Sequence, residues 1–267
     1  MNLTYLGWLS LGAAAVAVIV FVLLFRRKSS VYRQELPRIY ELRDLAHHPA
    51  SPDFYFRNLD QSLADIPQKL KQFRDLERDL ESLDPVAWAF LKSELEPLLT
   101  AKDPMRGWEA LLNRINQAKA YAYLKRSGYG HVAFIPTSSV KGKKTPDLKA
   151  DNGVERALCE VKTINMSDIE AERRATGGAG TSDDQLQIAF FNKLGSTLRQ
   201  AKAQIDAYDP ASVCKKIAYV IINYDDSLHE YAAPYQLMID DYLAHTHPAP
   251  GLHVEFDIKD PYYTAMS

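Results

Sequence analysis

Residues 145–164 read TPDLKADNGVERALCEVKTI, two short runs of strand-forming residues joined by turn-forming residues at 151–153. Side chains alternate between the two faces of a strand, so Glu160 and Lys162 share one face of the second run. The turn folds the first run back on the second and brings Asp147 close to Glu160. This stretch therefore predicts a pair of adjacent strands that carries two carboxylates and a lysine.

This grouping suits metal-dependent chemistry. Two neighbouring carboxylates repel each other unless a cation neutralises them, and a hard divalent ion with oxygen ligands fits such a pair. Asp147 and Glu160 are therefore predicted to bind Mg²⁺ (or Mn²⁺), and Lys162 to orient a nucleophile or stabilise developing charge. A structural ion pair on a solvated sheet face is the alternative interpretation.

The same residues resemble the signature of the PD-(D/E)xK nuclease superfamily, a Pro-Asp dipeptide followed by acid-x-lysine on the next strand. The order of elements over 116–163, a Gly-terminated helix, a strand, a Ser-containing loop and the motif, is similar to the Holliday-junction-resolvase-like branch. The resemblance implies a restriction-endonuclease-like fold and a catalytic role for Asp147, Glu160 and Lys162. It extends loosely to a later helix, and there it implies secondary roles for Gln200 in catalysis and Lys202 in substrate binding.

The sequence departs from the family pattern on the first helix, where many members carry a glutamate. Asn116 and Gln117 stand at about that position, and Glu109 lies about two turns earlier. Which of these three helps to hold a metal stays open. Without them, the predicted ligands are the two strand carboxylates and the carbonyl of Val161, which suffice for one ion but are also compatible with a non-cutting relative.

A rival acid-x-lysine occurs near the end of the chain, at Asp257-Ile258-Lys259. It has no Pro-Asp dipeptide at a suitable distance. The motif at residues 146–162 is therefore the preferred site.

Lysines surround the predicted site. Four of them flank Asp147 and are predicted to contact the phosphate backbone of a nucleic acid, DNA rather than RNA: Lys141, Lys143, Lys144 and Lys149. A solvated lysine loop without a ligand is the alternative. An oligomer is compatible with the sequence.

The N-terminus carries a second strong signal. Residues 6–25 are uncharged and almost wholly apolar, and a helix of that length matches the hydrocarbon core of a bilayer. Basic residues 26–28 follow at once, and no Lys or Arg precedes the run, so the positive-inside rule places the rest of the chain in the cytoplasm. We expect a single-pass inner-membrane anchor at residues 1–28 with its N-terminus outside; a cleaved signal peptide is the competing interpretation.

The remainder divides into two regions by its periodicity. Residues 29–104 show helical spacing and predict a stalk or hairpin, with one helical stretch over 54–83 and another that starts at Asp84-Pro85. Residues 105–267 predict an α/β domain whose mixed sheet is flanked by helices. The expected helices are 105–126, 186–208 and 234–245, and the expected strands are 131–135, 157–164, 217–224 and 253–258.

The composition excludes several classes of protein. The 267 residues are 46% hydrophobic and 25% charged with a net charge of −2, which excludes a disordered chain and a globally basic nucleic-acid coat. Two cysteines cannot form a disulfide framework.

The sequence thus predicts a membrane-anchored, Mg²⁺-dependent endonuclease that acts on the cytoplasmic side. The alternative is a catalytically inactive, membrane-tethered binding or scaffold module on the same fold. A weaker third hypothesis is an assembly factor that acts through the helices of residues 32–100.

Overall fold

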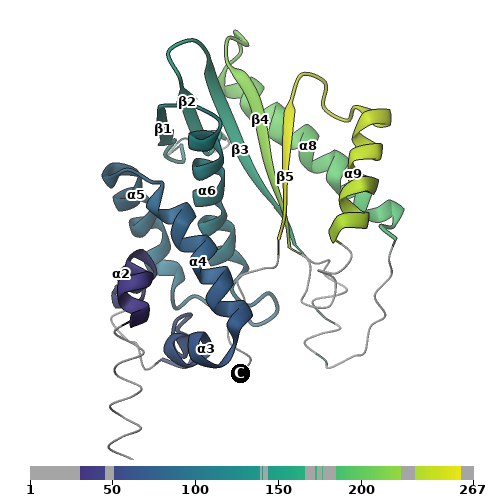
Figure 1. Ribbon diagram of the computed structural model, residues 1–267. Helices are drawn as coiled ribbons and strands as arrows, with labels where there is room; N and C mark the ends of the chain where they lie inside the picture. The colour runs from purple at the N-terminus through teal and green to yellow at the C-terminus, as the bar shows by residue number, and fades with distance from the viewer. Residues whose placement is uncertain are drawn as a thin grey trace, which may run out of the picture.

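The computed structural model describes residues 31–45, 51–138, 140, 144–165, 172, 176, 185–223 and 232–259 (Figure 1). The anchor expected at residues 1–28 lies outside these ranges. Among the residues that are described, no helix combines the length and the apolar character needed to cross a bilayer.

The described part of the chain contains a five-stranded mixed sheet with the strand order β1-β2-β3-β4-β5. The first three strands pair antiparallel, whereas β3, β4 and β5 run parallel. This confirms the α/β class and the mixed sheet flanked by helices. The bounds are β1 (His131–Phe134), β2 (Leu148–Asp151), β3 (Arg156–Ile164), β4 (Lys215–Asn223) and β5 (His253–Lys259).

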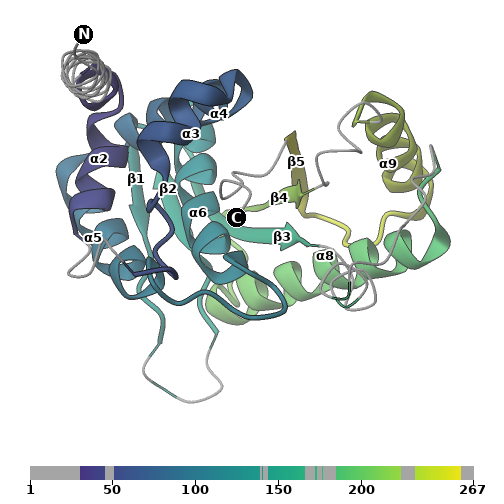
Figure 2. The same ribbon diagram turned by 90° about the horizontal axis from the view of Figure 1, so that it is seen from below.

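Helices cover both faces of the sheet (Figures 1 and 2). Helix α6 (Glu109–Arg126) packs on one face, while α8 (Ile188–Tyr208) and α9 (Ala232–Thr246) lie on the other. The alternation along β3 follows this arrangement, since Cys159 belongs to the core on the α6 side and Ile164 to the core on the α8 side.

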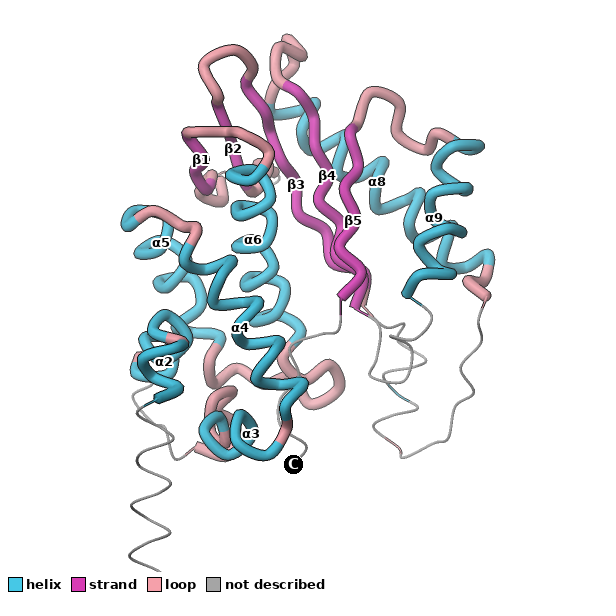
Figure 3. Tube along the Cα trace, in the orientation of Figure 1, coloured by secondary structure: helices cyan, strands magenta, loops and turns pink. Residues whose placement is uncertain are grey.

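The N-terminal helices gather beside α6 (Figure 3): α4 and α5 pack directly on it, α5 also contacts β1, and α2 packs on α4. Their apolar residues join α6 and one sheet face in a single hydrophobic cluster, which runs from Leu36 to Ile221. The core therefore continues across residue 104. The bounds are α2 (Pro37–Asp44), α3 (Leu59–Asp65), α4 (Pro67–Glu81), α5 (Pro85–Leu95) and the 3₁₀ helix η1 (Glu96–Leu98).

The prediction of one helical stretch over residues 54–83 was wrong, because the helix is interrupted at Ile66, between α3 and α4. This residue has an extended backbone (φ −124°, ψ 95°), the conformation that a following proline favours, and Pro67 opens α4. Likewise the helix expected from about residue 105 begins at Glu109. The Asp103 carboxylate accepts the backbone N–H groups of residues 105 and 106, both at 2.7 Å, and holds that segment in a turn.

The start of α5 is as predicted. The Asp84 carboxylate accepts the backbone N–H of Ala87 at 2.8 Å, and Pro85 is the first helical residue.

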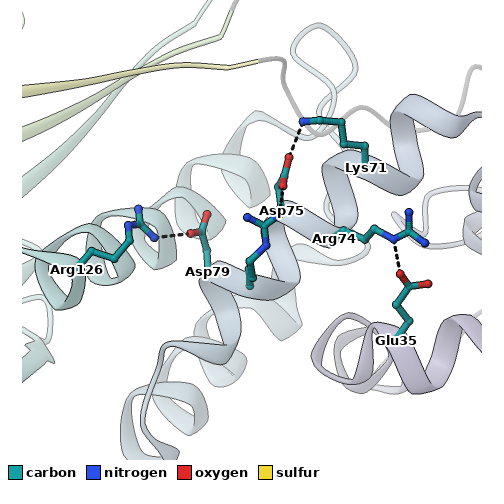
Figure 4. Close-up of polar contacts among 7 residues, drawn as sticks. Glu35, Lys71, Arg74, Asp75, Asp79 and Arg126 are labelled. Atoms are coloured by element: carbon teal, nitrogen blue, oxygen red, sulfur yellow. Dashed lines mark hydrogen bonds and ion pairs between the residues drawn. The ribbon is translucent and has the colours of Figure 1, made fainter.

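Ion pairs tie α4 to its neighbours (Figure 4). Arg126 at the end of α6 pairs with Asp79 of α4 at 3.2 Å, and Arg74 pairs with Glu35 just before α2. Helix α4 is thus fixed to α6 as well as to the start of the described chain.

Candidate active site

The strand register brings the two predicted carboxylates together. Leu148 of β2 lies opposite Cys159 of β3, so Asp147, one residue before β2, faces Glu160 across the antiparallel pair. The Asp147 side chain is held there by the backbone, because its Oδ2 accepts the N–H of Val161 at 2.8 Å. The turn at residues 151–153 therefore folds β2 back on β3 and brings Asp147 close to Glu160, as the sequence predicted.

Glu160 is almost completely buried, with 3% of its surface exposed. Its Oε1 accepts a hydrogen bond from Lys162 Nζ at 2.6 Å, and its Oε2 accepts one from Gln204 Nε2 at 2.8 Å. The Lys162 side chain is 23% exposed, so its ammonium group reaches both the carboxylate and solvent. Glu160 and Lys162 form the pair on one strand face that their spacing predicted.

The first-helix residue that contacts the site is Gln117. Its Nε2 donates to Asp147 Oδ1 at 2.6 Å, while its Oε1 accepts from Arg114 at 3.1 Å. Arg114 in turn pairs with Glu94 of α5 at 3.1 Å. Because Arg114 binds the amide oxygen, the amide N–H₂ of Gln117 must face Asp147.

The other two first-helix residues point elsewhere. Asn116 donates to the hydroxyl of Thr163 at 3.1 Å, and Glu109 pairs with Arg106 at 2.8 Å. The position open in the sequence is therefore filled by an amide and not by a third acid.

The two carboxyl groups perturb each other. Burial raises the pKa of Asp147, although the backbone N–H of Val161 and the nearby charges of Lys162 and Arg114 oppose this shift. Burial, and then the charge of Asp147, raise the pKa of Glu160 to about 7, against the opposing effect of Lys162. Without a cation, the pair therefore retains a proton close to neutral pH.

The donor atoms at this site suit a hard divalent ion. The structure shows no group of three or more His, Cys, Asp or Glu side chains arranged for a metal within its described ranges, so the site rests on two carboxylates and the adjacent carbonyl of Val161. Mg²⁺ is commonly held by one or two carboxylates, with waters and substrate phosphates in its other positions. A pair of carboxyls that retains a proton close to neutral pH even beside Lys162 fits such an ion, whose double charge would replace that proton.

Helix α8 contributes to the site through Gln204, which was not among the residues predicted to act. The Gln200 side chain is exposed and makes no hydrogen bond within the described residues, and Lys202 pairs with Asp206 at 2.5 Å. Gln204 lies one turn beyond Gln200 on the same helix face, and its Nε2 also donates to the carbonyl of Thr145 at 2.6 Å. The sequence indicated the correct face of α8 but not the correct turn.

The structure describes two of the four lysines that flank Asp147 in the sequence. Lys144 and Lys149 are exposed, on either side of Asp147. Lys141 and Lys143 lie outside the described residues.

The rival motif belongs to a different part of the sheet. Asp257 of β5 is buried on the α6 side, where it accepts a hydrogen bond from the Tyr219 hydroxyl at 3.0 Å and lies 3.8 Å from the ammonium of Lys119. It pairs in register with Ile221, whose side chain is in the α6-side core. Glu160 faces α8, so the two acid-x-lysine motifs are on opposite faces.

In comparisons with protein-family models, with curated proteins and with solved structures, no match to this chain was found.

Proposed function

We propose that this chain is a metal-dependent nuclease of the PD-(D/E)xK type that hydrolyses phosphodiester bonds, in DNA rather than RNA. The observation that carries the proposal is the convergence of Asp147, Glu160 and Lys162 from two adjacent strands. The half-buried carboxyl of Asp147 and the buried carboxyl of Glu160 lie side by side, and the lysine contacts Glu160 while it reaches solvent.

Each residue has a role in this proposal. Asp147, Glu160 and the Val161 carbonyl would hold Mg²⁺ or Mn²⁺. The bound ion supplies Lewis-acid polarisation of the phosphoryl group and lowers the pKa of a bound water. Lys162 donates a hydrogen bond to the non-bridging phosphoryl oxygen or to the attacking water, where negative charge develops.

The amides keep the carboxylates in place. Gln117 fixes the side-chain oxygen of Asp147 that the backbone of Val161 leaves free, and Gln204 does the same for Glu160 opposite Lys162. We assign both as positioning residues. The proposal also includes the N-terminal anchor at residues 6–25, a cytoplasmic location of the catalytic region and phosphate contacts from Lys144 and Lys149 together with Lys141 and Lys143.

The test is a cleavage assay with the purified full chain on supercoiled plasmid, branched DNA and RNA, with Mg²⁺ or with a chelator. We expect nicking that needs the metal and is abolished in Lys162→Ala. Lys71→Ala is the matched control, because it removes an exposed lysine from α4 and leaves the site intact. Lack of metal-dependent cutting of every substrate by the folded wild type would contradict the proposal.

A second candidate is a tethered nucleic-acid-binding module without catalysis. The observation that favours it is the amide of Gln117 at the place of a third acid. A binding module would retain its affinity for nucleic acid in Lys162→Ala, show no cutting in the wild type, and show no requirement for Mg²⁺.

A further inference from the structure

A cavity of about 680 Å³ lies on the sheet beside the carboxylates. Its lining comes from β1, β2 and β3, from the end of α8 and from the segment that leads into β4. Helix α8 packs on β3 and β4 and crosses the sheet on this side (Figure 1), so the cavity lies where the helix ends beside the outer strands.

The cavity adjoins the proposed active site along both strands. Lys149, in its lining, is two residues beyond Asp147, and Leu158 is two residues before Glu160, so all four side chains share one sheet face. Two strand residues span about 7 Å. A nucleic-acid strand with one phosphate at the carboxylates would thus place its next nucleotide at the cavity.

The cations of the cavity have no partner within the described residues. Lys149 and Arg156 are both exposed and take part in no ion pair or side-chain hydrogen bond there. The aspartates of the lining do have partners, since each accepts a backbone N–H from a nearby turn or helix start: Asp84 at 2.8 Å, Asp151 at 2.6 Å and Asp209 at 3.0 Å. Lys149 and Arg156 are therefore the charged groups of the lining that remain free to bind an anion.

The rest of the lining offers apolar surface for a planar group. Leu158 is a buried member of the lining, and Tyr208 and Val213 have 39% and 61% of their surfaces exposed. An aromatic ring beside cations is the combination that binds the bases and phosphates of single strands. A base can enter a cavity only when it is outside the duplex stack.

We propose that this cavity binds the unpaired nucleotide next to the scissile phosphate, with its base on Tyr208 and its phosphate at Lys149 and Arg156. This inference rests on the proposed nuclease function and names its substrate class, nucleic acid with a single-stranded segment at the point of cleavage.

The first test is equilibrium binding of a labelled single-stranded DNA oligonucleotide to the full chain without divalent ions, measured by fluorescence anisotropy. We expect Tyr208→Ala and Arg156→Ala each to weaken binding about tenfold, while Tyr208→Phe retains it because the ring remains. Lys71→Ala, an exposed lysine on α4, should bind as the wild type does. Equal affinity of the wild type, Tyr208→Ala and Arg156→Ala would overturn the proposal.

The second test compares kcat/KM on a bulged duplex and on a fully paired duplex of the same sequence. We expect about a tenfold preference of the wild type for the bulge, by the size of one stacking contact, and its loss in Tyr208→Ala. Cutting that is abolished by Lys162→Ala but shows no preference for the bulged duplex would contradict the proposed nucleotide site and support the nuclease function. Binding of single-stranded DNA that depends on Tyr208, without cutting of any substrate, would contradict the nuclease function and support the nucleotide site.

Discussion

The pKa of Glu160 makes the stability of the metal-free chain depend on pH. The folded state raises this pKa from an ordinary 4.5 to about 7, so the protonated carboxyl is favoured by folding. The stabilising contribution is fully present below pH 4.5 and is lost as the pH rises through 7. The change is on the order of 3 kcal/mol, a shift of roughly 5–10 °C in Tm. Thermal unfolding in a chelator should therefore show a lower Tm at pH 8 than at pH 5.5.

Mg²⁺ should reverse this dependence, because the ion binds only the deprotonated pair. The increase in Tm on addition of Mg²⁺ is expected to be larger at pH 8 than at pH 5.5, and to be lost in Glu160→Gln. An equal increase at both pH values, or an increase retained in Glu160→Gln, would contradict the assignment of this residue as a ligand.

Gln117→Glu tests the residue that stands in for the family's usual acid. A third carboxylate beside Asp147 should strengthen Mn²⁺ binding about tenfold and destabilise the metal-free chain, because like charges then converge without a cation. Isothermal titration calorimetry with Mn²⁺ measures the first effect. Glu109→Gln is the control, since Glu109 pairs with Arg106 and should leave the affinity unchanged. Weaker binding in Glu109→Gln, or no gain in Gln117→Glu, would reject this assignment.

At the scale of single elements, α4 fixes the start of α2. The buried carboxylate of Glu77 accepts the backbone N–H groups of Arg38 and Ile39 at 2.9 and 3.0 Å, at the first turn of α2. Glu77→Ala leaves both donors without a partner and should lower the free energy of unfolding by about 1–3 kcal/mol. Urea denaturation measures this, with the exposed Glu81→Ala as control, expected within about 0.5 kcal/mol of the wild type. A similar loss of unfolding free energy in Glu77→Ala and Glu81→Ala would contradict this role of the Glu77 carboxylate.

The elements that were predicted well share a local cause. The alternation over 157–164 and the turn at 151–153 fix a strand pair through neighbouring residues, and the approach of Asp147 to Glu160 follows from that pair. The break at Ile66 was missed because the apolar spacing of three and four continues across it, although the following proline signalled it.

The contacts that were not predicted are distant in sequence. Gln117 meets Asp147 from a helix packed on the sheet, and Gln204 meets Glu160 from a helix on the other face. The packing angle and axial position of each helix decide which turn reaches the strand, and neither quantity is encoded in a local pattern. Sequence reasoning could therefore name three candidates on α6 but could not choose among them.

At the scale of the whole molecule, the N-terminal helices complete the core of the sheet region. Leu42, Leu76 and Leu91 from these helices share one cluster with Ile115 of α6. A fragment of residues 105–267 would expose that side of α6 to water, and we expect it to lose cooperative unfolding and near-ultraviolet circular dichroism. Cooperative unfolding of the fragment at the Tm of the full chain would show that the two regions are independent.

The rate of DNA cleavage under single-turnover conditions at saturating Mg²⁺ tests the central claim most directly. Lys162→Ala and Glu160→Gln should each reduce the rate constant of the wild type about 10²- to 10³-fold, because each removes a group at the reacting phosphate or its metal, while Lys71→Ala cuts at the wild-type rate. Rate constants for Lys162→Ala and Glu160→Gln within a few-fold of the wild type would contradict the assignment of the Asp147–Glu160–Lys162 group as the active site.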